Sequence, residues 1–507
     1  MLVFLQKLHT FGSMNKASNP IKKLAGETAV YGLGTMVPRF LNYLLVPLYT
    51  IYVFTEAEYG QVTLLYSYVA ILLVLLTYGM ETAFFRYANK NENPNKVFNT
   101  STSSVLITAI IFLIIIFVFV DDISRLIQYP SNNEYVLIIA LIIAIDAITA
   151  LPFAFLRYQN KAIKFSSIRV ISVVITISLN LIFLVVIPNY FGEEYKNLPV
   201  YRSTNLVSFV FIANLIGSLS TLFMLSKEFR SFRFKIDTVL LKKMLKYGLP
   251  ILIISLSFMI TEVADKILLK YLLPDRANAD SQLGIYAASY KLAIIMMLFI
   301  QMFRYAAEPF FFSEADKKDA KKTYSKVMTL FVAFTWFIFL MVTLYINLFK
   351  HFIGEAFWPG LEIVPIILSA KLFLGIFYNL SVWYKLTNKT FYGAIIAIVA
   401  GAITIVLNVL LIPHFGYMGS AWANFVSYLA VIIISYIWGR KIYRVNYDIK
   451  KILLYTFVAL AIYFISLYSF NVDSYSYYIL VSLLLLSYTL FIVFMETSRE
   501  KLRINKG

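Results

Sequence analysis

The sequence contains fourteen apolar runs, each long enough to cross a membrane as a helix. A helix needs about 20 predominantly apolar residues to span the ~30 Å hydrocarbon core of a bilayer. The polar segments between the runs are too short to bury a hydrophobic core of their own. The runs cover residues 25–53, 62–85, 98–120, 135–156, 163–187, 204–226, 248–273, 284–312, 324–349, 361–384, 391–413, 419–438, 449–468 and 477–495. The chain is therefore predicted to be an all-α polytopic membrane protein with about 14 transmembrane helices.

Lys and Arg residues are concentrated in every second gap between the apolar runs. If the N-terminus is cytoplasmic, about 33 basic residues fall in cytoplasmic segments and about 6 in external ones, as the positive-inside rule requires. The clearest basic segments cover residues 227–246, 317–326 and 440–451. We therefore expect both termini in the cytoplasm and the basic segments at the anionic inner leaflet.

The composition argues against several other classes of protein. Hydrophobic residues make up 60% of the chain and charged residues 14%, which is unusual for a soluble domain. The net charge of +18 is dispersed over loops at one membrane face instead of forming one patch, which argues against a nucleic-acid partner. Cysteine is absent, and His9, His351 and His414 are scattered, so we expect no disulfide, metal site or cofactor.

The first residues of the chain leave two translation starts open. Residues 1–11 are apolar but too short for the charged region and apolar core of a signal peptide. A second methionine, Met14, begins the segment Met14-Asn15-Lys16. N-terminal sequencing that recovered Met1 would exclude a start at Met14.

The two halves of the chain contain similar motifs in the same order. Six apolar runs separate the matched motifs, so both copies have the same orientation in the membrane, as in transporters built from parallel repeats. The pairs are Tyr31-Gly32-Leu33 with Tyr247-Gly248-Leu249, Tyr59-Gly60 with Gly284-Ile285-Tyr286, and Phe85-Arg86-Tyr87 with Phe303-Arg304-Tyr305, at offsets of 216, 224 and 218 residues. The repeat predicts two six-helix lobes that face each other across a central cavity.

This repeat divides the chain into five expected parts. They are a cytoplasmic tail over residues 1–24, an N-terminal lobe over 25–226, a basic cytoplasmic linker over 227–247, a C-terminal lobe over 248–438, and two further helices with a cytoplasmic tail over 439–507.

Three groups of motifs resemble those of bacterial polysaccharide-export flippases. These flippases are the Wzx-like branch of the superfamily that includes MATE drug exporters and the lipid II flippase. The resemblance covers essentially the whole chain. One departure is Asp265-Lys266, where family members often have Asp-Arg, and Lys keeps the charge but lacks the planar fork of Arg. The motifs are Lys246-Tyr247-Gly248-Leu249-Pro250 with Asp265-Lys266, Gly284-Ile285-Tyr286 and Tyr290-Lys291; Leu44-Leu45-Val46-Pro47-Leu48-Tyr49-Thr50 with Glu58-Tyr59-Gly60 and Gly79-Met80-Glu81; and Asn408, Pro413-His414-Phe415-Gly416 and Gly419-Ser420-Ala421.

The resemblance implies a substrate, a compartment and partners. The expected substrate is an undecaprenyl-diphosphate-linked oligosaccharide, the repeat unit of a cell-surface polysaccharide such as the O-antigen of lipopolysaccharide. The expected location is the bacterial cytoplasmic (inner) membrane, and the expected partners are membrane lipids and the polymerase and glycosyltransferases of the same pathway. Coupling to an H⁺ or Na⁺ gradient is left open.

Six basic residues lie more than one helical turn from either end of an apolar run, and a charged side chain costs about 2.5–3.5 kcal/mol at the centre of a membrane helix. Arg169 and Arg304 lie near expected cytoplasmic helix ends and can extend to the interface. Lys266 has Glu262 one turn earlier, an order that favours an ion pair within the helix. The other three, which have no acidic residue within one turn, are Arg39, Lys291 and Lys371.

These cations suit a diphosphate. Arginine can bind two phosphate oxygens at once, whereas lysine acts as a mobile point charge. We therefore predict that Arg39, Lys291 and Lys371 line the cavity and bind the diphosphate, with Lys266 as a weaker candidate.

Each acidic residue inside the runs has two possible roles. Asp146 either forms an interhelical ion pair with Arg39 or binds a coupling proton or Na⁺, and Glu262 and Asp265 are further candidates for either role. Pro38 and Pro47 remove backbone hydrogen bonds from the first run and bend it. This bend is either a gate between inward-open and outward-open states or a static kink.

Two other functions compete with a flippase. A MATE-type multidrug or cation antiporter shares the expected architecture, but cationic drugs require an acidic cavity, and the locally unpaired charges here are mostly basic. A membrane enzyme, such as a glycosyltransferase or ligase, would need catalytic carboxylates in substantial loops. The acidic pairs at 56 and 58 and at 121 and 122 lie in short external segments. The chain is therefore predicted to be a transporter and not an enzyme.

Overall fold

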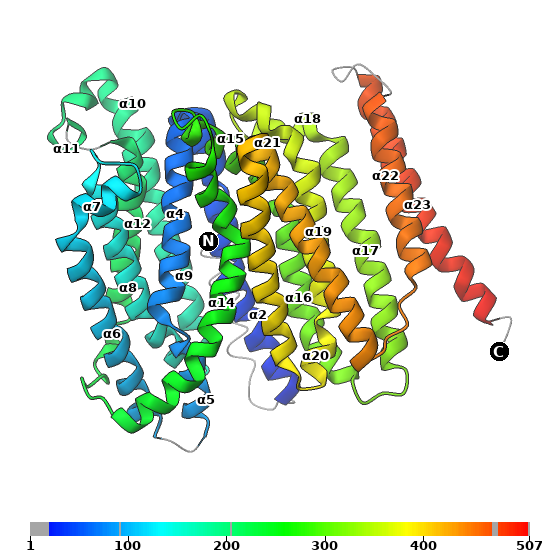
Figure 1. Ribbon diagram of the computed structural model, residues 1–507, viewed down its shortest axis with the longest axis horizontal. Helices are drawn as coiled ribbons and strands as arrows, with labels where there is room; N and C mark the ends of the chain where they lie inside the picture. Colours follow the sequence, from blue (N-terminus) through cyan, green and yellow to red (C-terminus); the bar gives the residue numbers. More distant parts are fainter. Residues whose placement is uncertain (1–19, 91–92, 203–204, 469–474, 505–507) are drawn as a thin grey trace. The chain divides into compact units, whose positions relative to one another are not determined.

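The computed structural model describes residues 20–90, 93–202, 205–468 and 475–504. These residues are all-α (Figure 1). They contain 11 helices that are long and apolar enough to cross a membrane. The prediction of an all-α, multi-pass membrane fold is thus confirmed, while the number of spans and their topology stay predictions. The second start considered, Met14, lies outside the described residues.

The chain forms two compact units. Unit 1 contains the residues up to Leu45 together with Leu65–Met259, and unit 2 contains Val46–Leu64 together with the residues from Ile260 onward. A short segment of the first repeat, Val46–Leu64, thus belongs to the unit that contains most of the second repeat.

The helices of unit 1 pack around buried aromatic side chains. On α8, Phe155 stacks on Phe98 of α6 with ring centres 4.6 Å apart, and Phe84 of α5 packs against both rings. The sequence defines the start of α6, because Asn93 accepts a hydrogen bond from the N–H of Asn95 and Pro94 occupies the first helical position. The elements are α2 (Pro20–Tyr43), most of α4 (Glu56–Thr77), α5 (Met80–Ala88), α6 (Pro94–Val118), α7 (Val120–Leu126), α8 (Asn133–Tyr158), α9 (Ala162–Leu181), the π-helix η2 (Ile182–Val186), α10 (Ile187–Phe191), the 3₁₀-helix η3 (Gly192–Asn197), α11 (Pro199–Arg202), α12 (Leu206–Met224), α13 (Ser226–Phe229) and the first part of α14 (Thr238–Leu272).

The segment before α14 is held along α6. Backbone N–H groups of Arg233, Lys235 and Asp237 donate to side chains near the start of α6, with N···O distances of 2.9–3.3 Å. Lys96 Nζ lies 2.6 Å from the Asp237 carboxylate, and its hydrogen bond lowers the pKa of Asp237. The part of the chain expected as a basic linker is therefore tied to unit 1, and α14 begins at Thr238, before the apolar run.

In unit 2 the long α21 contains two antiparallel helices. Its bend lies at Gly416, whose φ of +54° favours glycine. Ser420 Oγ donates to Asn408 Oδ1 at 2.8 Å and Thr404 Oγ1 to Ser427 Oγ at 3.1 Å, so the two halves pack side by side. The elements are the π-helix η1 (Leu48–Val53), the start of α4, the rest of α14, α15 (Ala279–Leu292), α16 (Ile294–Glu314), α17 (Ala320–Leu344), α18 (Ile346–Phe349), the 3₁₀-helices η4 (Lys350–Phe352) and η5 (Glu355–Ile363), α19 (Val364–Leu380), α20 (Val382–Leu386), α21 (Thr390–Ile442), α22 (Ile449–Tyr468) and α23 (Tyr475–Ile504); α3 (Leu45–Pro47) lies at the boundary between the units.

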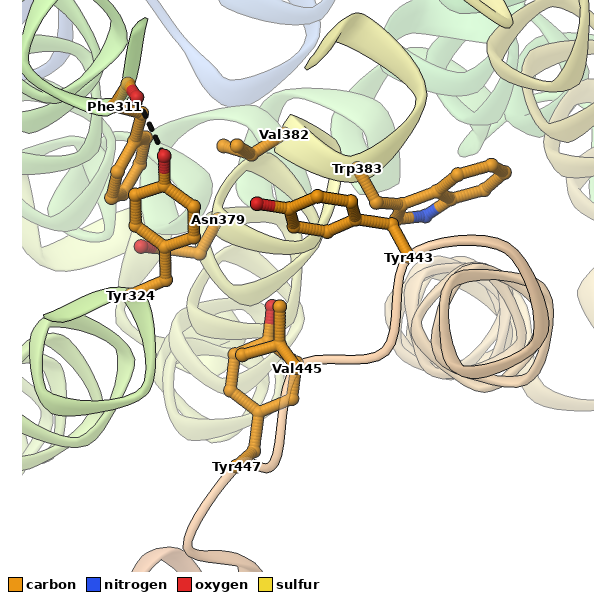
Figure 2. Close-up of a pocket in the computed structure, with 8 residues that line it drawn as sticks. All are labelled: Phe311, Tyr324, Asn379, Val382, Trp383, Tyr443, Val445 and Tyr447. Carbon is orange, nitrogen blue, oxygen red and sulfur yellow. Dashed lines mark hydrogen bonds between the residues drawn. The ribbon is translucent and has the colours of Figure 1, made fainter. Parts of the chain in front are cut away.

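Within unit 2 the last two helices, α22 and α23, pack beside α17 (Figure 1). Trp336 Nε1 of α17 donates to Thr456 Oγ1 of α22 at 2.9 Å, and Lys451 Nζ of α22 lies 2.6 Å from the carboxylate of Glu496 in α23. The connector between α21 and α22 places alternate residues, Tyr443, Val445 and Tyr447, against the ends of α16, α17 and α20, where they line a small pocket (Figure 2).

The second helix of each repeat is interrupted at a corresponding place. In the first repeat, Tyr78 and Gly79 take positive φ angles of 33° and 73° and separate α4 from α5. In the second, Ala293 separates α15 from α16. These interruptions lie 214 residues apart, close to the offsets between the repeated motifs.

Candidate functional site

Unit 2 contains a buried group of charged and polar side chains, here called the unit 2 cluster. Four helices that are distant in the sequence supply its members, so only tertiary packing brings them together. The unit 2 cluster consists of Glu262, Asp265 and Lys266 from α14, Tyr286 and Tyr290 from α15, Lys371 from α19, and Asn424 and Tyr428 from α21.

Lys371 forms an ion pair with Glu262. Lys371 Nζ lies 3.0 Å from each carboxylate oxygen of Glu262, and the hydroxyl of Tyr428 also donates to this carboxylate. The Lys371 side chain is 3% exposed and that of Glu262 is 19% exposed. Burial of this kind requires a close counter-ion. Lys371 therefore has an acidic partner, which its own helix did not reveal.

The predicted pairing of Lys266 with the Glu262 carboxylate is wrong. Lys266 Nζ donates instead to the backbone carbonyl oxygen of Glu262 at 3.0 Å and to Asp265 Oδ1, also at 3.0 Å. The physical reason is that the Glu262 carboxylate is bound by Lys371 and Tyr428.

Asp265 is fully buried, and hydrogen bonds occupy both of its carboxylate oxygens. Its Oδ1 accepts from the N–H and Nζ of Lys266 at 2.8 and 3.0 Å. Its Oδ2 accepts from the hydroxyl of Tyr286 at 2.6 Å and from Asn424 Nδ2 at 2.9 Å. A carboxylate has about four acceptor positions, so in this arrangement a further ligand would have to displace one of these donors.

Two neighbouring residues at the end of α15 have unused polar groups. The hydroxyl of Tyr290 is buried and has no hydrogen-bond partner among the described residues, and its ring centre lies 4.4 Å from Lys266 Nζ. Lys291 is half-buried, and in the part of the chain that the structure covers it forms neither a hydrogen bond nor an ion pair. The charges of Glu262, Asp265, Lys266 and Lys371 cancel, and Lys291 lies close enough to Lys266 to be repelled. Lys291 is therefore a surplus positive charge beside the unit 2 cluster.

In unit 1, Asp146 contacts residues other than the predicted Arg39. Asp146 Oδ1 on α8 accepts a hydrogen bond from Ser218 Oγ on α12 at 2.8 Å. Arg169 on α9 is close enough to interact electrostatically with both Asp146 and Arg39. Its guanidinium lies 4.2 Å from the ring centre of Phe153. The position of Arg169 near the start of its run predicts an interfacial side chain, whereas in the structure it is close enough to Asp146 and Arg39 to interact with both electrostatically.

Sequence reasoning missed Asn424 and Tyr428. The chain contains 37 tyrosines, so a single tyrosine such as Tyr428 does not stand out. Both residues also contact partners more than 130 positions away in the sequence. A usable signal was the polar stripe on α21, because Ser420, Asn424 and Tyr428 recur every fourth residue along an otherwise apolar helix.

A pair of tyrosine variants tests the hydrogen bonds of the unit 2 cluster. Tyr286→Phe is expected to lower the free energy of unfolding by about 1–3 kcal/mol, because it removes a donor from a fully buried carboxylate. Tyr290→Phe removes a hydroxyl without a partner among the described residues and is expected to change stability by less than ~0.5 kcal/mol. Thermal unfolding of the purified protein in detergent measures both, and equal losses would contradict this assignment.

Comparison with known protein families assigns the sequence to a family. Residues 24–314 match the family model described as polysaccharide biosynthesis protein. No curated protein matches the sequence.

The fold is similar to several solved transporters. The lipid II flippase MurJ, in an inward closed conformation, superimposes with a TM-score of 0.72 at 14% identity, over 93% of this chain and 99% of MurJ. An inward-facing multidrug resistance MATE family transporter of the MOP superfamily gives 0.57 at 14% identity, over 85% and 95%. A mutant of the Vibrio cholerae MATE transporter VcmN gives 0.56 at 13% identity, over 83% and 97%. These structures share the fold of this chain, and the family model covers more than half of it: the protein belongs to the polysaccharide biosynthesis protein family and has the fold seen in MurJ and in MATE transporters.

Proposed function

We propose that this protein flips an undecaprenyl-diphosphate-linked oligosaccharide across the bacterial cytoplasmic membrane by alternating access through a basic central cavity. The family supports a polysaccharide repeat unit as the cargo, and a protein of similar fold is titled a lipid II flippase. The observation that carries the proposal is Lys291, a half-buried cation without a partner among the described residues. A charge in a membrane-spanning region is expensive unless it is paired, and a diphosphate would supply its counter-charge.

The cationic candidates differ in how readily they can bind a diphosphate. Lys291 needs no rearrangement, because no carboxylate among the described residues pairs with it. Lys371 and Lys266 already bind the carboxylates of Glu262 and Asp265, so a diphosphate would have to compete for them. Arg39 is exposed in unit 1 and would bind two phosphate oxygens through its guanidinium. Lys291 and Arg39 are therefore the main diphosphate ligands in this proposal, with Lys371 and Lys266 secondary.

Asp146 is the better candidate for a coupling ion. Glu262 and Asp265 each form an ion pair with an ammonium group of the unit 2 cluster. Asp146 instead accepts a hydrogen bond from the neutral hydroxyl of Ser218, and its interaction with Arg169 is electrostatic. A carboxylate that accepts one such bond keeps acceptor positions for a proton or Na⁺. Comparing flipping rates with and without each gradient tests this role.

The two prolines of the first run lie beside a change in helix geometry. α2, which contains Pro38, ends at Tyr43, and the π-helix η1 begins directly after Pro47. Interruptions of this kind often mark functional hinges. In the proposed cycle the chain bends between Pro38 and η1 as access alternates.

Proteoliposomes test the proposed function directly. We expect purified protein to move a fluorescent undecaprenyl-diphosphate-linked oligosaccharide to the opposite leaflet, where an enzyme or quencher outside the vesicle detects it. Empty vesicles are the control, and an imposed H⁺ or Na⁺ gradient identifies the coupling ion. The main alternative is a MATE-type drug or cation antiporter, which the fold also resembles. Uptake of a cationic drug without flipping of the lipid would overturn the proposal.

A further inference from the structure

The segment Val46–Leu64 makes an unusually close contact with α15 within unit 2. A Cβ atom built on Gly60 of α4 would lie 1.9 Å from the backbone oxygen of Asp280, and one built on Gly284 of α15 would lie 1.8 Å from the backbone oxygen of Glu56. Real Cβ atoms do not approach oxygen so closely. The two helices can therefore touch only because both positions are glycine.

This contact is reciprocal and follows the internal repeat. Each glycine packs on the carbonyl group four residues before the other glycine. The offset from Glu56 to Asp280 and the offset from Gly60 to Gly284 are both 224 residues, the same as the repeat offset in this part of the sequence. Equivalent positions of the two repeats thus meet each other, as across a local two-fold axis.

A third glycine holds the same segment from another side. A Cβ atom on Gly354, just before η5, would lie 2.0 Å from the backbone oxygen of Thr50. The N–H of Gly354 donates to Thr50 Oγ1 at 3.3 Å, and the Tyr59 ring packs edge-on against Phe357. We call these three contacts the glycine clasp: Gly60 on Asp280, Gly284 on Glu56, and Gly354 on Thr50.

Two properties make the glycine clasp suited to repeated opening and closing. Contacts between a glycine Cα–H and a carbonyl oxygen are weaker than N–H···O hydrogen bonds, so a few of them can separate readily. The clasped segment, which contains the π-helix η1, is also separated from α2 by the irregular backbone at Leu44, and these interruptions allow it to move with respect to α2.

We propose that the glycine clasp is a releasable gate on the predicted external side of the protein. It is closed in this structure, and it opens in the conformation that releases substrate on that side. This inference rests on the proposed function, because only a transport cycle requires the helices to separate here. It adds the residues that close the gate and the reason they are glycine.

The absence of cysteine in the chain allows a direct test. Thr50 is 5% exposed, so Thr50→Cys places a single buried thiol within the closed glycine clasp. A membrane-impermeant maleimide added to intact cells should label it slowly. Adding Gly60→Ala or Gly284→Ala should raise labelling severalfold, because the new methyl group prevents closure. Gly32→Ala is the matched control, since a Cβ on Gly32 meets no atom within 4 Å and should leave labelling unchanged.

A second reporter separates gate opening from unfolding. Ser124 in unit 1 is fully buried and lies in the predicted external segment after the third run, so Ser124→Cys should stay unlabelled in every folded variant and become labelled in an unfolded one. Unchanged labelling of Thr50→Cys in both alanine variants would overturn the gate. If the alanine variants unfold, labelling of Thr50→Cys alone should rise when lipid-linked oligosaccharide is present, and a lack of change would overturn the gate.

The labelling result is independent of the flipping assay. Increased labelling of the alanine variants, combined with no flipping by the unmodified protein, would support the gate and reject the proposed substrate. Normal flipping by Gly284→Ala would reject the gate and leave the substrate standing.

Discussion

Lys371→Met is expected to lower the free energy of unfolding by about 3–5 kcal/mol, because it leaves the Glu262 carboxylate buried without its counter-ion. Lys371 is 3% exposed and its Nζ lies 3.0 Å from both carboxylate oxygens of Glu262, so little water can replace the lost charge. The hydrogen bond from Tyr428 remains in the variant, but a neutral donor does not cancel a buried negative charge. Thermal and denaturant unfolding in detergent measure the loss.

The double variant Glu262→Gln with Lys371→Met shows whether the loss comes from the ion pair. Removing both charges together should recover most of the stability, because neither charge is then left unpaired. Lys322→Met is the matched control: Lys322 is 80% exposed and pairs with an exposed Asp319, so its loss should change stability by less than ~1 kcal/mol. A double variant as unstable as Lys371→Met alone would contradict this explanation.

The fold class was predictable because membrane-spanning helices leave a local signal. Each apolar run can be recognised within its own 20 or so residues, since the bilayer sets the length of a spanning helix. The break between the two helices of α21 also leaves a local signal, because Gly416 lies between the two apolar runs and takes a positive φ.

The partners of the buried charges were not predictable in the same way. Sequence spacing on one helix suggested that Glu262 binds Lys266, four residues later. The structure shows a competitor, Lys371, which lies 109 residues from Glu262 in the sequence and takes its carboxylate. Asp265 then becomes the partner of Lys266. Pairing among buried charges depends on which helices touch, and spacing within one helix contains no information on that.

The close helix contact at the glycine clasp was only partly predictable from the sequence. The Tyr-Gly motifs around Gly60 and Gly284 were visible as a repeat, but their function as contact points was not. A glycine beside an apolar run is equally consistent with a turn, a bend or a close approach. Only the carbonyl groups of Asp280 and Glu56, positioned by the fold, show which of these applies.

Lys291→Met is expected to slow flipping by about 10–100-fold, the equivalent of losing one charge-assisted hydrogen bond of ~1.5–3 kcal/mol to the diphosphate. Its stability should be unchanged or higher, because Lys291 pairs with no group among the described residues and is repelled by Lys266. Lys291→Arg keeps the charge and should retain most of the rate. Flipping rates and melting temperatures of the same preparations therefore separate Lys291 from Lys371, whose loss should reduce both. A normal flipping rate for Lys291→Met would remove the main diphosphate ligand from the proposal.

Arg39→Ala extends this test to unit 1. If Arg39 and Lys291 bind the same diphosphate, the double variant should flip the lipid little more slowly than the slower single variant, because the second cation has no correctly placed phosphate left to bind. If the two residues act at separate steps, their effects on the rate should multiply. Normal export and protein level with Arg39→Ala would exclude Arg39 as a ligand. If the effects multiply, Arg39 acts at another step of the transport cycle, where its electrostatic interaction with Arg169 is the contact to test next.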